Sequence, residues 1–294
     1  MNILVTGASG LLGRSLIPVL QSRHEHVFAV ARTATGAPNH TIGDLTDPVA
    51  TQVLLKTTQP HVIVHLAGGN PPDPHDLYLS NVVTTVNLFQ SLEQLGRRPY
   101  VISAGSAAEY GESNAARIDE DASLQPVTTY GRAKAAQTIL SQALAQRAGI
   151  PLTLVRPFNI VSPGLPERSA LGNIRTQLTT QTGPERRVRC GRLDVVRDFV
   201  SLNFVTEAIV RLVESPAADR TLNICSGVAL TLGEVVKAMA DRLGATPVIE
   251  PVPELMALPA AGQAVGDPTA LRELIGLSFD ATADAIARIV LGET

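Results

Sequence analysis

Short apolar runs alternate with longer amphipathic stretches over the first half of the chain. Five runs rich in β-branched residues have the length and composition of buried strands: residues 2–6, 26–31, 61–66, 100–103 and 152–156. Four stretches between them carry apolar residues at helical spacing: residues 11–22, 48–57, 77–95 and 129–147. This alternation predicts an α/β protein with a Rossmann-type doubly wound parallel sheet, covered by helices on both faces.

The pattern becomes irregular after residue 157, where glycine and proline interrupt the chain. Regular patterns return later, as a strand at 221–225 and as helices at 205–215, 232–243 and 282–290. We therefore expect two domains. The sheet domain comprises residues 1–157 with about 195–217, and a smaller, partly discontinuous C-terminal α/β domain comprises residues 158–194 and 218–294.

Composition limits the classes of partner. The 294 residues carry a formal net charge of −3, so no basic surface is expected for nucleic acid or for an anionic membrane. No stretch reaches the roughly 20 apolar residues of a membrane helix, and the start lacks the features of a secretory leader, so a cytoplasmic protein is expected. The two cysteines and six histidines show no metal-site spacing, and no metal is expected.

The first predicted strand runs directly into a loop with Gly7, Gly10 and Gly13. A glycine-rich turn between a strand and a helix lets the backbone approach a pyrophosphate, whose charge the helix N-terminus then stabilises. The spacing differs from that of the commoner dinucleotide loop, and an ordinary tight turn is the alternative. The position between the first strand and the first helix favours a dinucleotide site.

Arg32 follows the second predicted strand, near the position where an acidic residue would hold the ribose 2′-hydroxyl of NAD. An arginine can instead form a bidentate pair with the 2′-phosphate of NADP(H). The sequence therefore favours NADP(H) over NAD(H). A solvated surface arginine is the alternative.

Tyr130 and Lys134 stand four residues apart at the start of the helix predicted at 129–147. Residues at this spacing share one helix face, so both side chains can enter one cleft. A tyrosine phenol has a reference pKa of about 10 and exchanges protons poorly near neutral pH, unless a nearby cation such as Lys134 lowers that pKa. An ordinary amphipathic helix is the alternative that the spacing alone leaves open.

Several motifs follow one another between residues 5 and 199. They are VTGASGLLG, GDLTD, HLAG, NVVTTVNL, SAGSAAEYG, YGRAK, RPFN and RDF. In this combination the chain resembles the extended short-chain dehydrogenase/reductase (NAD-dependent epimerase/dehydratase) family, and within it the enzymes that act on nucleotide-diphosphate sugars. The resemblance implies a nicotinamide cofactor in the first domain and a nucleotide sugar in the second.

The resemblance also implies roles for individual residues. The catalytic group is Ser106, Tyr130 and Lys134, with Ser103 as a competing candidate for Ser106. Substrate contacts are implied for Ser106, Asn159 and Arg197, although Arg197 could instead pair with a neighbouring acid. Cofactor contacts are implied for Gly7, Ser9, Gly10, Leu11, Leu12, Gly13, Arg32, Asp44, Leu45, Leu66, Ala67, Gly68, Asn81, Tyr130, Lys134 and Pro157.

The residues after Ser106 separate the reactions that such relatives catalyse. Ala107 and Ala108 stand where the 4,6-dehydratases carry acidic residues, and Ala108 stands where the 3,5-epimerase/reductases carry a cysteine. Neither elimination of water nor epimerisation by deprotonation is therefore supported, and hydride transfer is the reaction that is left. Arg32 favours an NADPH-dependent reductase that acts on the C4 ketone of a GDP- or dTDP-linked 4-keto-6-deoxyhexose. The resemblance is closest to GDP-4-keto-6-deoxy-D-mannose reductases, and departures from their motifs in the second domain leave base and sugar open.

Two other functions stay open. One is an NAD-retaining NDP-sugar 4-epimerase, and the other is a non-catalytic NADP(H)-binding protein, which the joint presence of Ser106, Tyr130 and Lys134 disfavours. The helices predicted at 77–95 and 129–147 are apolar over more than one face, and relatives often dimerise through this pair. A homodimer is therefore expected, although a helix pair buried within one chain would show the same pattern.

Overall fold

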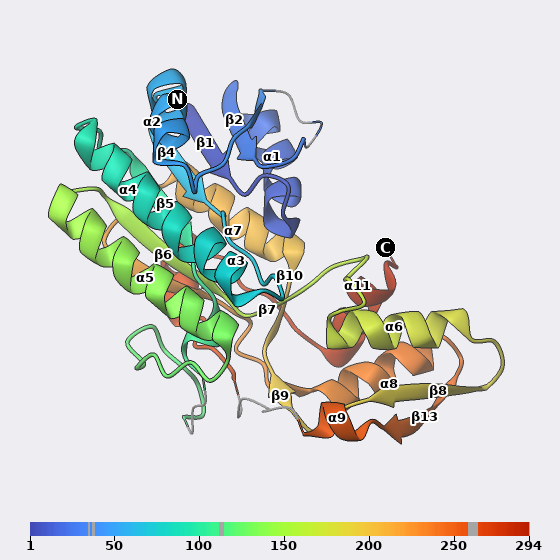
Figure 1. Cartoon of the computed structure of the whole chain (residues 1–294). Helices are drawn as coiled ribbons and strands as arrows, with labels where there is room; N and C mark the ends of the chain where they lie inside the picture. Colours follow the sequence, from blue (N-terminus) through green and yellow to red (C-terminus); the bar gives the residue numbers. More distant parts are fainter. Residues whose placement is uncertain (35, 37–38, 112–114, 258–263, 294) are drawn as a thin grey trace. The chain divides into compact units, whose positions relative to one another are not determined.

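The computed structural model describes residues 1–34, 36, 39–111, 115–257 and 264–293 (Figure 1). The chain divides into two compact units. The first comprises Met1–Glu109, Leu124–Pro157 and Val205–Leu222, and the second comprises Tyr110–Ser123, Phe158–Phe204 and Asn223–Thr294. Residues 110–123 and 195–204, which the sequence pattern grouped with the first domain, thus belong to the second unit.

A seven-stranded sheet forms the centre of the first unit, in the order β3-β2-β1-β4-β5-β6-β11. The strands are β1 (Asn2–Thr6), β2 (His26–Ala31), β3 (His40–Ile42), β4 (Val62–His65), β5 (Tyr100–Ala104), β6 (Leu152–Pro157) and β11 (Arg220–Ile224). The pairs from β3 to β6 are parallel, and the order reverses between β1 and β4. The predicted doubly wound Rossmann-type sheet is confirmed.

Helices cover both faces of this sheet. On one face α2 (Pro48–Thr58), α4 (Thr84–Gln94) and α5 (Thr129–Ala148) pack side by side, and on the other face lie α1 (Leu11–Arg23) and α7 (Leu202–Glu214) (Figure 1). Apolar side chains of the strands fill the space beneath them, among them Leu4, Ile63 and Val101. Each face of the sheet is therefore shielded from water, as continuous apolar strands require.

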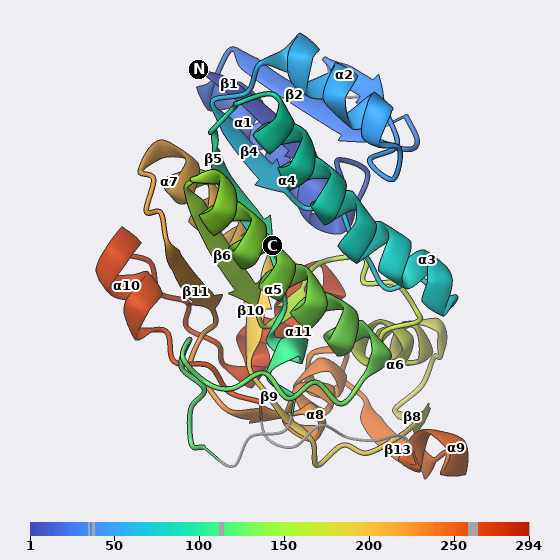
Figure 2. The ribbon, with the colours of Figure 1, turned by 60° about the vertical axis from the view of Figure 1, so that its left-hand side comes forward.

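The predicted helix at 77–95 is in fact three segments. Figure 2 shows α3 (Pro74–Tyr78) continuing into α4, with a π-helical turn, Leu79–Val83, between them. A π-turn inserts one residue into the helical register and commonly marks a functional position. Asn81 lies in this turn, and its contacts are described with the site below.

The ends of α5 follow the signals in the sequence. The Thr128 side chain caps the helix by accepting a hydrogen bond from the backbone N–H of Gly131 at 3.0 Å, and Gly149 ends it with a left-handed φ of 64°. These two signals place Tyr130 in the first turn of the helix and Lys134 one turn later.

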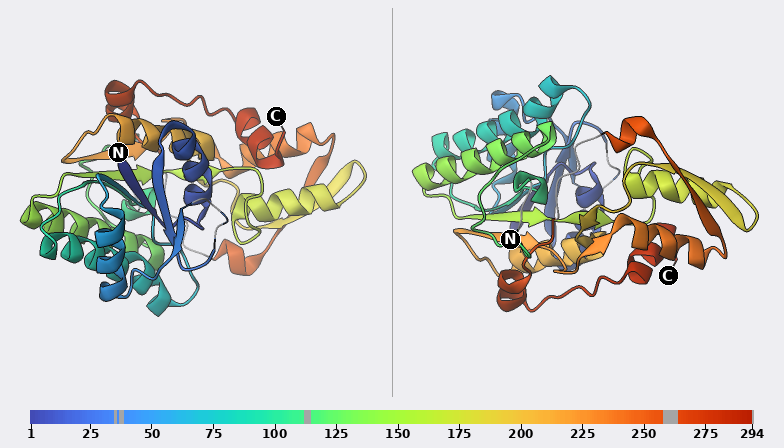
Figure 3. Two further views of the ribbon diagram at one scale, coloured as in Figure 1. Left: turned by 90° about the horizontal axis from the view of Figure 1, so that it is seen from above. Right: turned by 90° about the horizontal axis from the view of Figure 1, so that it is seen from below.

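The second unit has its own apolar core. Helices α6 (Ala170–Thr180), α8 (Leu232–Arg242) and α11 (Ala283–Leu291) pack with the parallel pair β8 (Glu185–Cys190) and β13 (Thr246–Pro251), shown from two sides in Figure 3. The remaining elements are short: β7 (Asn159–Val161), β9 (Val196–Arg197), β10 (Phe199–Ser201), β12 (Leu230–Thr231), α9 (Pro253–Met256) and α10 (Thr269–Ile275). The apolar core of the second unit includes Val161, Leu178 and Met239.

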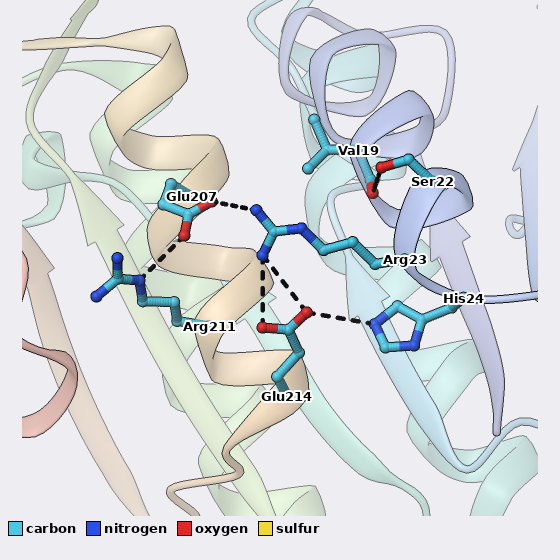
Figure 4. A network of polar contacts seen from close by, with 7 residues as sticks. All are labelled: Val19, Ser22, Arg23, His24, Glu207, Arg211 and Glu214. Atoms are coloured by element: carbon cyan, nitrogen blue, oxygen red, sulfur yellow. Dashed lines mark hydrogen bonds and ion pairs between the residues drawn. The ribbon is translucent and has the colours of Figure 1, made fainter.

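Charged side chains connect α1 with α7 on the surface of the first unit. Arg23 donates to Glu207 at 2.9 Å and to Glu214 at 3.4 Å, and Glu207 also accepts from Arg211 at 3.0 Å (Figure 4). The Ser15 and Thr206 hydroxyls form a further hydrogen bond at 2.8 Å. Exposed ion pairs of this kind contribute up to about 1 kcal/mol each, so this network stabilises the pairing of the two helices only slightly.

Throughout the described part of the chain, every helix is too short or too polar to cross a lipid bilayer.

Candidate active site

A pocket of about 140 Å³ lies at the carboxyl ends of β1, β2, β3 and β4 in the first unit. Its lining residues are Gly7, Ser9, Gly10, Val30, Ala31, Arg32, Gly43, Asp44, Leu45, Thr46, Ala67, Gly68, Ser80 and Thr84. The crevice at the reversal of strand order is where doubly wound sheets bind their ligands. The pocket thus brings together eight residues that the motifs assign to a cofactor, from Gly7 in the first loop to Gly68 after β4.

Two positions of the glycine loop accept no residue larger than glycine. Gly7 has a φ of +67°, and a Cβ on it would lie 2.5 Å from the Leu66 carbonyl oxygen. A Cβ on Gly13 would lie 2.5 Å from the Gly7 carbonyl oxygen, so α1 packs directly on the loop. Among the described residues none caps the first turn of α1 with a side chain, which leaves its N–H groups for a ligand. An uncapped helix start beside a pocket fits the pyrophosphate of a dinucleotide.

The other motif residues assigned to a cofactor are not among the described lining residues of this pocket. They are Leu11, Leu12, Gly13, Leu66, Asn81, Tyr130, Lys134 and Pro157. Leu11 is exposed on the first turn of α1, whereas Pro157 is buried at the end of β6. Their expected cofactor contacts stay predictions.

Asn81 holds the loop that follows β4. Its amide nitrogen donates to the carbonyl oxygens of Gly69 at 2.9 Å and Leu77 at 2.7 Å, and its oxygen accepts from the Gly69 N–H at 3.2 Å. The side chain is fully buried, and a Cβ on Gly68 would lie 2.5 Å from its oxygen. Asn81 therefore shapes the Gly68–Gly69 wall of the pocket from behind.

Ser106 and Tyr130 lie near each other in the first unit, and the Ser106 hydroxyl acts to lower the pKa of the Tyr130 phenol. Ser106 precedes the short 3-10 turn η2 (Ala107–Glu109), and its Oγ accepts from the Ala108 N–H at 3.2 Å. The competing Ser103 lies inside β5 and is 1% exposed. A Cβ on Gly131 would lie 2.4 Å from the Ala108 carbonyl oxygen, so α5 packs tightly on the Ser106 turn. This close packing brings the two hydroxyls together.

Lys134 connects this pair of hydroxyls with the cofactor pocket. Its buried ammonium donates to the Ala104 carbonyl oxygen and to Gln137 Oε1, both at 2.9 Å. A Cβ on Gly68 would lie 3.1 Å from Lys134 Nζ, so the lysine reaches the pocket wall. Burial lowers the pKa of Lys134 to about 8, and the charge of Glu109 partly opposes that shift.

The pKa of Tyr130 differs from the sequence-based expectation that Lys134 lowers it. Burial raises the pKa of the Tyr130 phenol above its ordinary value, the hydrogen bond with Ser106 acts to lower it, and the charge of Glu109 raises it further. The lowering contribution thus comes from Ser106 rather than from Lys134. The physical reason is that Tyr130 is largely withdrawn from water, which penalises the charged phenolate.

Three buried polar residues near the site were given no role by the sequence. Glu109 and Arg156 form an ion pair at 3.0 Å between Oε2 and Nε. His65 bridges the hydroxyls of Thr6 and Thr85, each at 2.9 Å, and burial lowers its pKa to about 3, so it stays neutral at physiological pH. All three stand within or beside the quoted motifs, and this position in the sequence could have marked them as residues of the site.

A second pocket, of about 430 Å³, lies within the second unit. It is lined by Asn159, Ile160, Val161, Leu165, Ser169, Ala170, Leu171, Arg192, Val195, Arg197, Phe199, Leu232 and Leu255. Two of the three residues that the motifs assign to the substrate, Asn159 and Arg197, are on its wall, and the third, Ser106, belongs to the first unit. Arg192 is a further basic residue there that the sequence analysis missed, and it forms an ion pair with Asp194 at 2.8 Å. The pocket combines apolar walls with two guanidinium groups.

Asp198 organises this wall. Its carbonyl oxygen accepts from the Asn159 side chain at 2.8 Å, and its carboxylate accepts from the N–H groups of Ser226, Gly227 and Gly266. Those contacts give Asp198 partners other than Arg197, whose guanidinium donates to the Val196 carbonyl oxygen at 2.7 Å. Burial lowers the pKa of Arg197.

In the described part of the chain, no group of three or more His, Cys, Asp or Glu side chains is placed to bind a metal ion.

Comparison with known proteins identifies relatives over most of the chain. The family model described as the NAD dependent epimerase/dehydratase family matches residues 3–225. A GDP-6-deoxy-D-talose 4-dehydrogenase of Aggregatibacter actinomycetemcomitans is 28% identical over 95% of this chain and 92% of its own length. A GDP-6-deoxy-D-mannose reductase of Pseudomonas aeruginosa is 27% identical over 82% of this chain and 79% of its own.

Among solved structures, the UDP-glucose 4-epimerase of Thermus thermophilus in complex with NAD has the same fold. It superposes with a TM-score of 0.84, covers 99% of this chain and 98% of its own, and is 22% identical.

Proposed function

Because the chain belongs to the NAD dependent epimerase/dehydratase family, we propose that it is an NADPH-dependent reductase of the C4 ketone of a nucleotide-diphosphate 4-keto-6-deoxyhexose. Family membership makes the chain a nicotinamide-dependent enzyme of the extended short-chain dehydrogenase/reductase type. The observation that carries the finer proposal is the proximity of Ser106 and Tyr130, with the Lys134 ammonium against the wall of the cofactor pocket.

Reduction of a ketone needs a hydride at carbon and a proton at oxygen. The nicotinamide cofactor, when bound, supplies the hydride. Tyr130 donates its phenolic proton to the carbonyl oxygen, and Ser106 donates a hydrogen bond to the same oxygen and orients it. Because the negative charge on that oxygen develops during the reaction, both groups act mainly in the transition state.

Lys134 holds the cofactor and balances charge. Its ammonium lies against Gly68, where it can donate to the ribose hydroxyls of a bound dinucleotide. Its positive charge also lowers the pKa of the buried Glu109 carboxyl group. The position of Lys134 between the pocket wall and Gln137 suits both tasks.

The second unit recognises the nucleotide in this proposal. Arg197 and Arg192 line a pocket with apolar walls, and guanidinium groups pair well with a diphosphate. The relatives named for GDP-6-deoxy-D-talose and GDP-6-deoxy-D-mannose support a GDP-linked sugar. Those two sugars differ only in configuration at C4, and reduction of one 4-ketone from its two faces gives both.

Arg32 supports NADPH as the reductant, because it lines the cofactor pocket at the end of β2 and is exposed there. The alternative function is an NAD-retaining 4-epimerase, which uses the same hydroxyl pair but returns the hydride to its substrate.

A homodimer formed through α4 and α5 is a further proposal. Sedimentation of the purified protein distinguishes a dimer from a monomer.

The test is NADPH oxidation with GDP-4-keto-6-deoxymannose and, in parallel, with dTDP-4-keto-6-deoxyglucose. Consumption of NADPH with one substrate, lost in Tyr130→Phe, is the expected result and identifies the nucleotide. Absence of consumption with both substrates, together with NAD released from the denatured protein, would favour the 4-epimerase.

A further inference from the structure

Glu109 is a fully buried carboxylate for which the proposed reaction has no role. It is 0% exposed and ends the turn Ala107–Glu109 that follows Ser106. Withdrawing a carboxylate from water is strongly unfavourable unless partners compensate. The partners of Glu109 therefore indicate what the residue does.

The first partner is the backbone of Ser106. Glu109 Oε1 accepts from the Ser106 N–H at 2.7 Å, and the Glu109 N–H donates to the Ser106 carbonyl oxygen at 3.1 Å. The turn is thus closed by two reciprocal hydrogen bonds. The Ala108 N–H between them donates to Ser106 Oγ at 3.2 Å. These contacts restrain both the backbone and the hydroxyl of Ser106.

The second partner is Arg156 of β6, whose guanidinium holds the other carboxylate oxygen at 3.0 Å. Arg156 is 4% exposed, so the pair forms one buried unit. Gly105 makes room for it, because a Cβ on that residue would lie 2.3 Å from Glu109 Oε1. Carboxylate, guanidinium and the Ser106 turn therefore fit together with little freedom to move.

The charged and titratable groups that face Glu109 come from two packed elements. Arg156 of β6 and Lys134 of α5 both act to lower the pKa of Glu109, whereas burial, the largest influence, raises it. In return the carboxylate raises the pKa of Tyr130 and of Lys134, both on α5. The charge of Glu109 thus shifts the pKa of two residues of the proposed catalytic group.

We propose that Glu109, held by Arg156, is a positioning residue that fixes the Ser106 hydroxyl relative to the Tyr130 phenol. Its kinetic consequence rests on the proposed ketone reduction, whereas its effect on the Ser106 turn does not. Glu109 itself touches the backbone of Ser106 and not the reacting atoms, so it acts through Ser106.

A double-mutant cycle separates positioning from a general structural role. Glu109→Gln keeps the shape but places an amide opposite Arg156, and we expect kcat to fall about 10-fold to 100-fold with KM for the ketone changed less than about twofold. In a Ser106→Ala background the same substitution should cost less than about threefold, because its target hydroxyl is gone. Losses that multiply in the double variant would overturn the proposal.

Gly105→Ala provides a second route should Glu109→Gln fail to fold. The added methyl group displaces the carboxylate while Glu109, Ser106, Tyr130 and Lys134 keep their chemistry. We expect a loss of kcat in the same direction, again reduced in the Ser106→Ala background. Glu93→Gln is the matched control, because Glu93 forms an exposed ion pair with Arg147 on α4 and α5 and should leave kcat unchanged.

A readout without turnover distinguishes failure of this inference from failure of the proposed function. The ultraviolet difference titration between each protein and its Tyr130→Phe counterpart reports the phenol of Tyr130. Loss of the Glu109 charge moves the pKa of that phenol down, whereas displacement of the Ser106 hydroxyl moves it up, so the shift caused by Glu109→Gln should differ between the wild-type and Ser106→Ala backgrounds. An equal shift in both backgrounds would contradict the inference. Should the wild type reduce neither ketone, the proposed function fails while this titration still tests Glu109.

Discussion

The proposed catalytic group of the first unit and the pocket of the second unit hold their charged residues in opposite ways. In the first unit Lys134 is 5% exposed and Glu109 is 0% exposed, and each is held by hydrogen bonds within the protein. In the second unit the Arg192 side chain is 46% exposed at the wall of a larger apolar pocket, and Arg197 is half-buried. Buried, preorganised groups are suited to stabilise a transition state, whereas accessible cations are suited to recognise a charged ligand.

Substitutions in the first unit should therefore lower turnover, and substitutions in the second should lower affinity. The largest effect is expected for Tyr130→Phe, because removing a proton donor costs about 10² to 10⁴-fold in kcat. NADPH affinity should stay within about twofold, since the ring remains in place. Steady-state kinetics together with NADPH titration measure both. A kcat within about threefold of wild type would remove Tyr130 from the proposed catalytic group.

Lys134→Met is expected to weaken NADPH binding by about 10-fold to 100-fold, the usual loss for a charge-assisted hydrogen bond. In the wild type, affinity should fall as pH rises through about 8, where Lys134 loses its charge. The Met variant should bind with a flat pH profile over that range. Fluorescence titration of NADPH at several pH values measures the difference. Equal pH dependence in both proteins would show that another group titrates.

The lowered pKa of Lys134 also affects stability. Its folded value of about 8 lies below the ordinary value of 10.5, so the unfolded chain binds more protons between these pH values. The free energy of unfolding should therefore rise with pH across this window. Urea unfolding of wild type and Lys134→Met at several pH values tests the sign. The variant should lack this contribution, and a wild-type contribution that falls with pH would contradict it.

Arg197→Ala should raise KM for the nucleotide sugar by about 10-fold to 100-fold and leave kcat within about threefold, since it removes a diphosphate contact. Arg187→Ala is the matched control, because the Arg187 side chain is 77% exposed on β8 and pairs with Glu250. An unchanged KM in Arg197→Ala would remove the proposed nucleotide contact. A large fall in kcat with an unchanged KM would contradict the assignment of turnover to the first unit and of substrate affinity to the second.

Arg32→Ser should lower NADPH affinity by about 10-fold while leaving NADH affinity nearly unchanged, because only the 2′-phosphate loses its partner. Parallel titration with both cofactors measures the ratio. Equal loss for both would assign Arg32 to the shape of the pocket rather than to the phosphate.

The smallest effect is expected for Arg23→Ala, which removes the exposed network between α1 and α7 (Figure 4). The free energy of unfolding should change by less than about 1 kcal/mol, and kinetics should not change. Thermal unfolding measures the stability. A larger loss would show that surface charge, rather than packing, holds these helices.

The first unit was far easier to predict from sequence than the second. The strands at 2–6 and 26–31 have the predicted bounds, because buried parallel strands read as continuous apolar runs. In contrast β8 reads ERRVRC, and β13 contains two prolines. Their pairing joins segments about 60 residues apart, so local patterns do not reveal it.

The same limit applies to the candidate site. Tyr130 and Lys134 share a helix face, so their proximity follows from spacing alone. The ion pair of Glu109 with Arg156 joins residues 47 positions apart, and the π-turn at Asn81 accompanies hydrogen bonds to Gly69. Contacts of this kind depend on tertiary packing, which local spacing cannot show.

The most direct test of the proposed reduction uses NADPH that carries deuterium at the transferred position of the nicotinamide, with the 4-keto sugar nucleotide as substrate. Mass spectrometry and NMR of the product locate the label. A reductase gives one deuterium at C4 for each NADPH consumed, and Tyr130→Phe abolishes both. Conversion between C4 epimers without NADPH consumption and without deuterium in the product would contradict the account and favour the 4-epimerase.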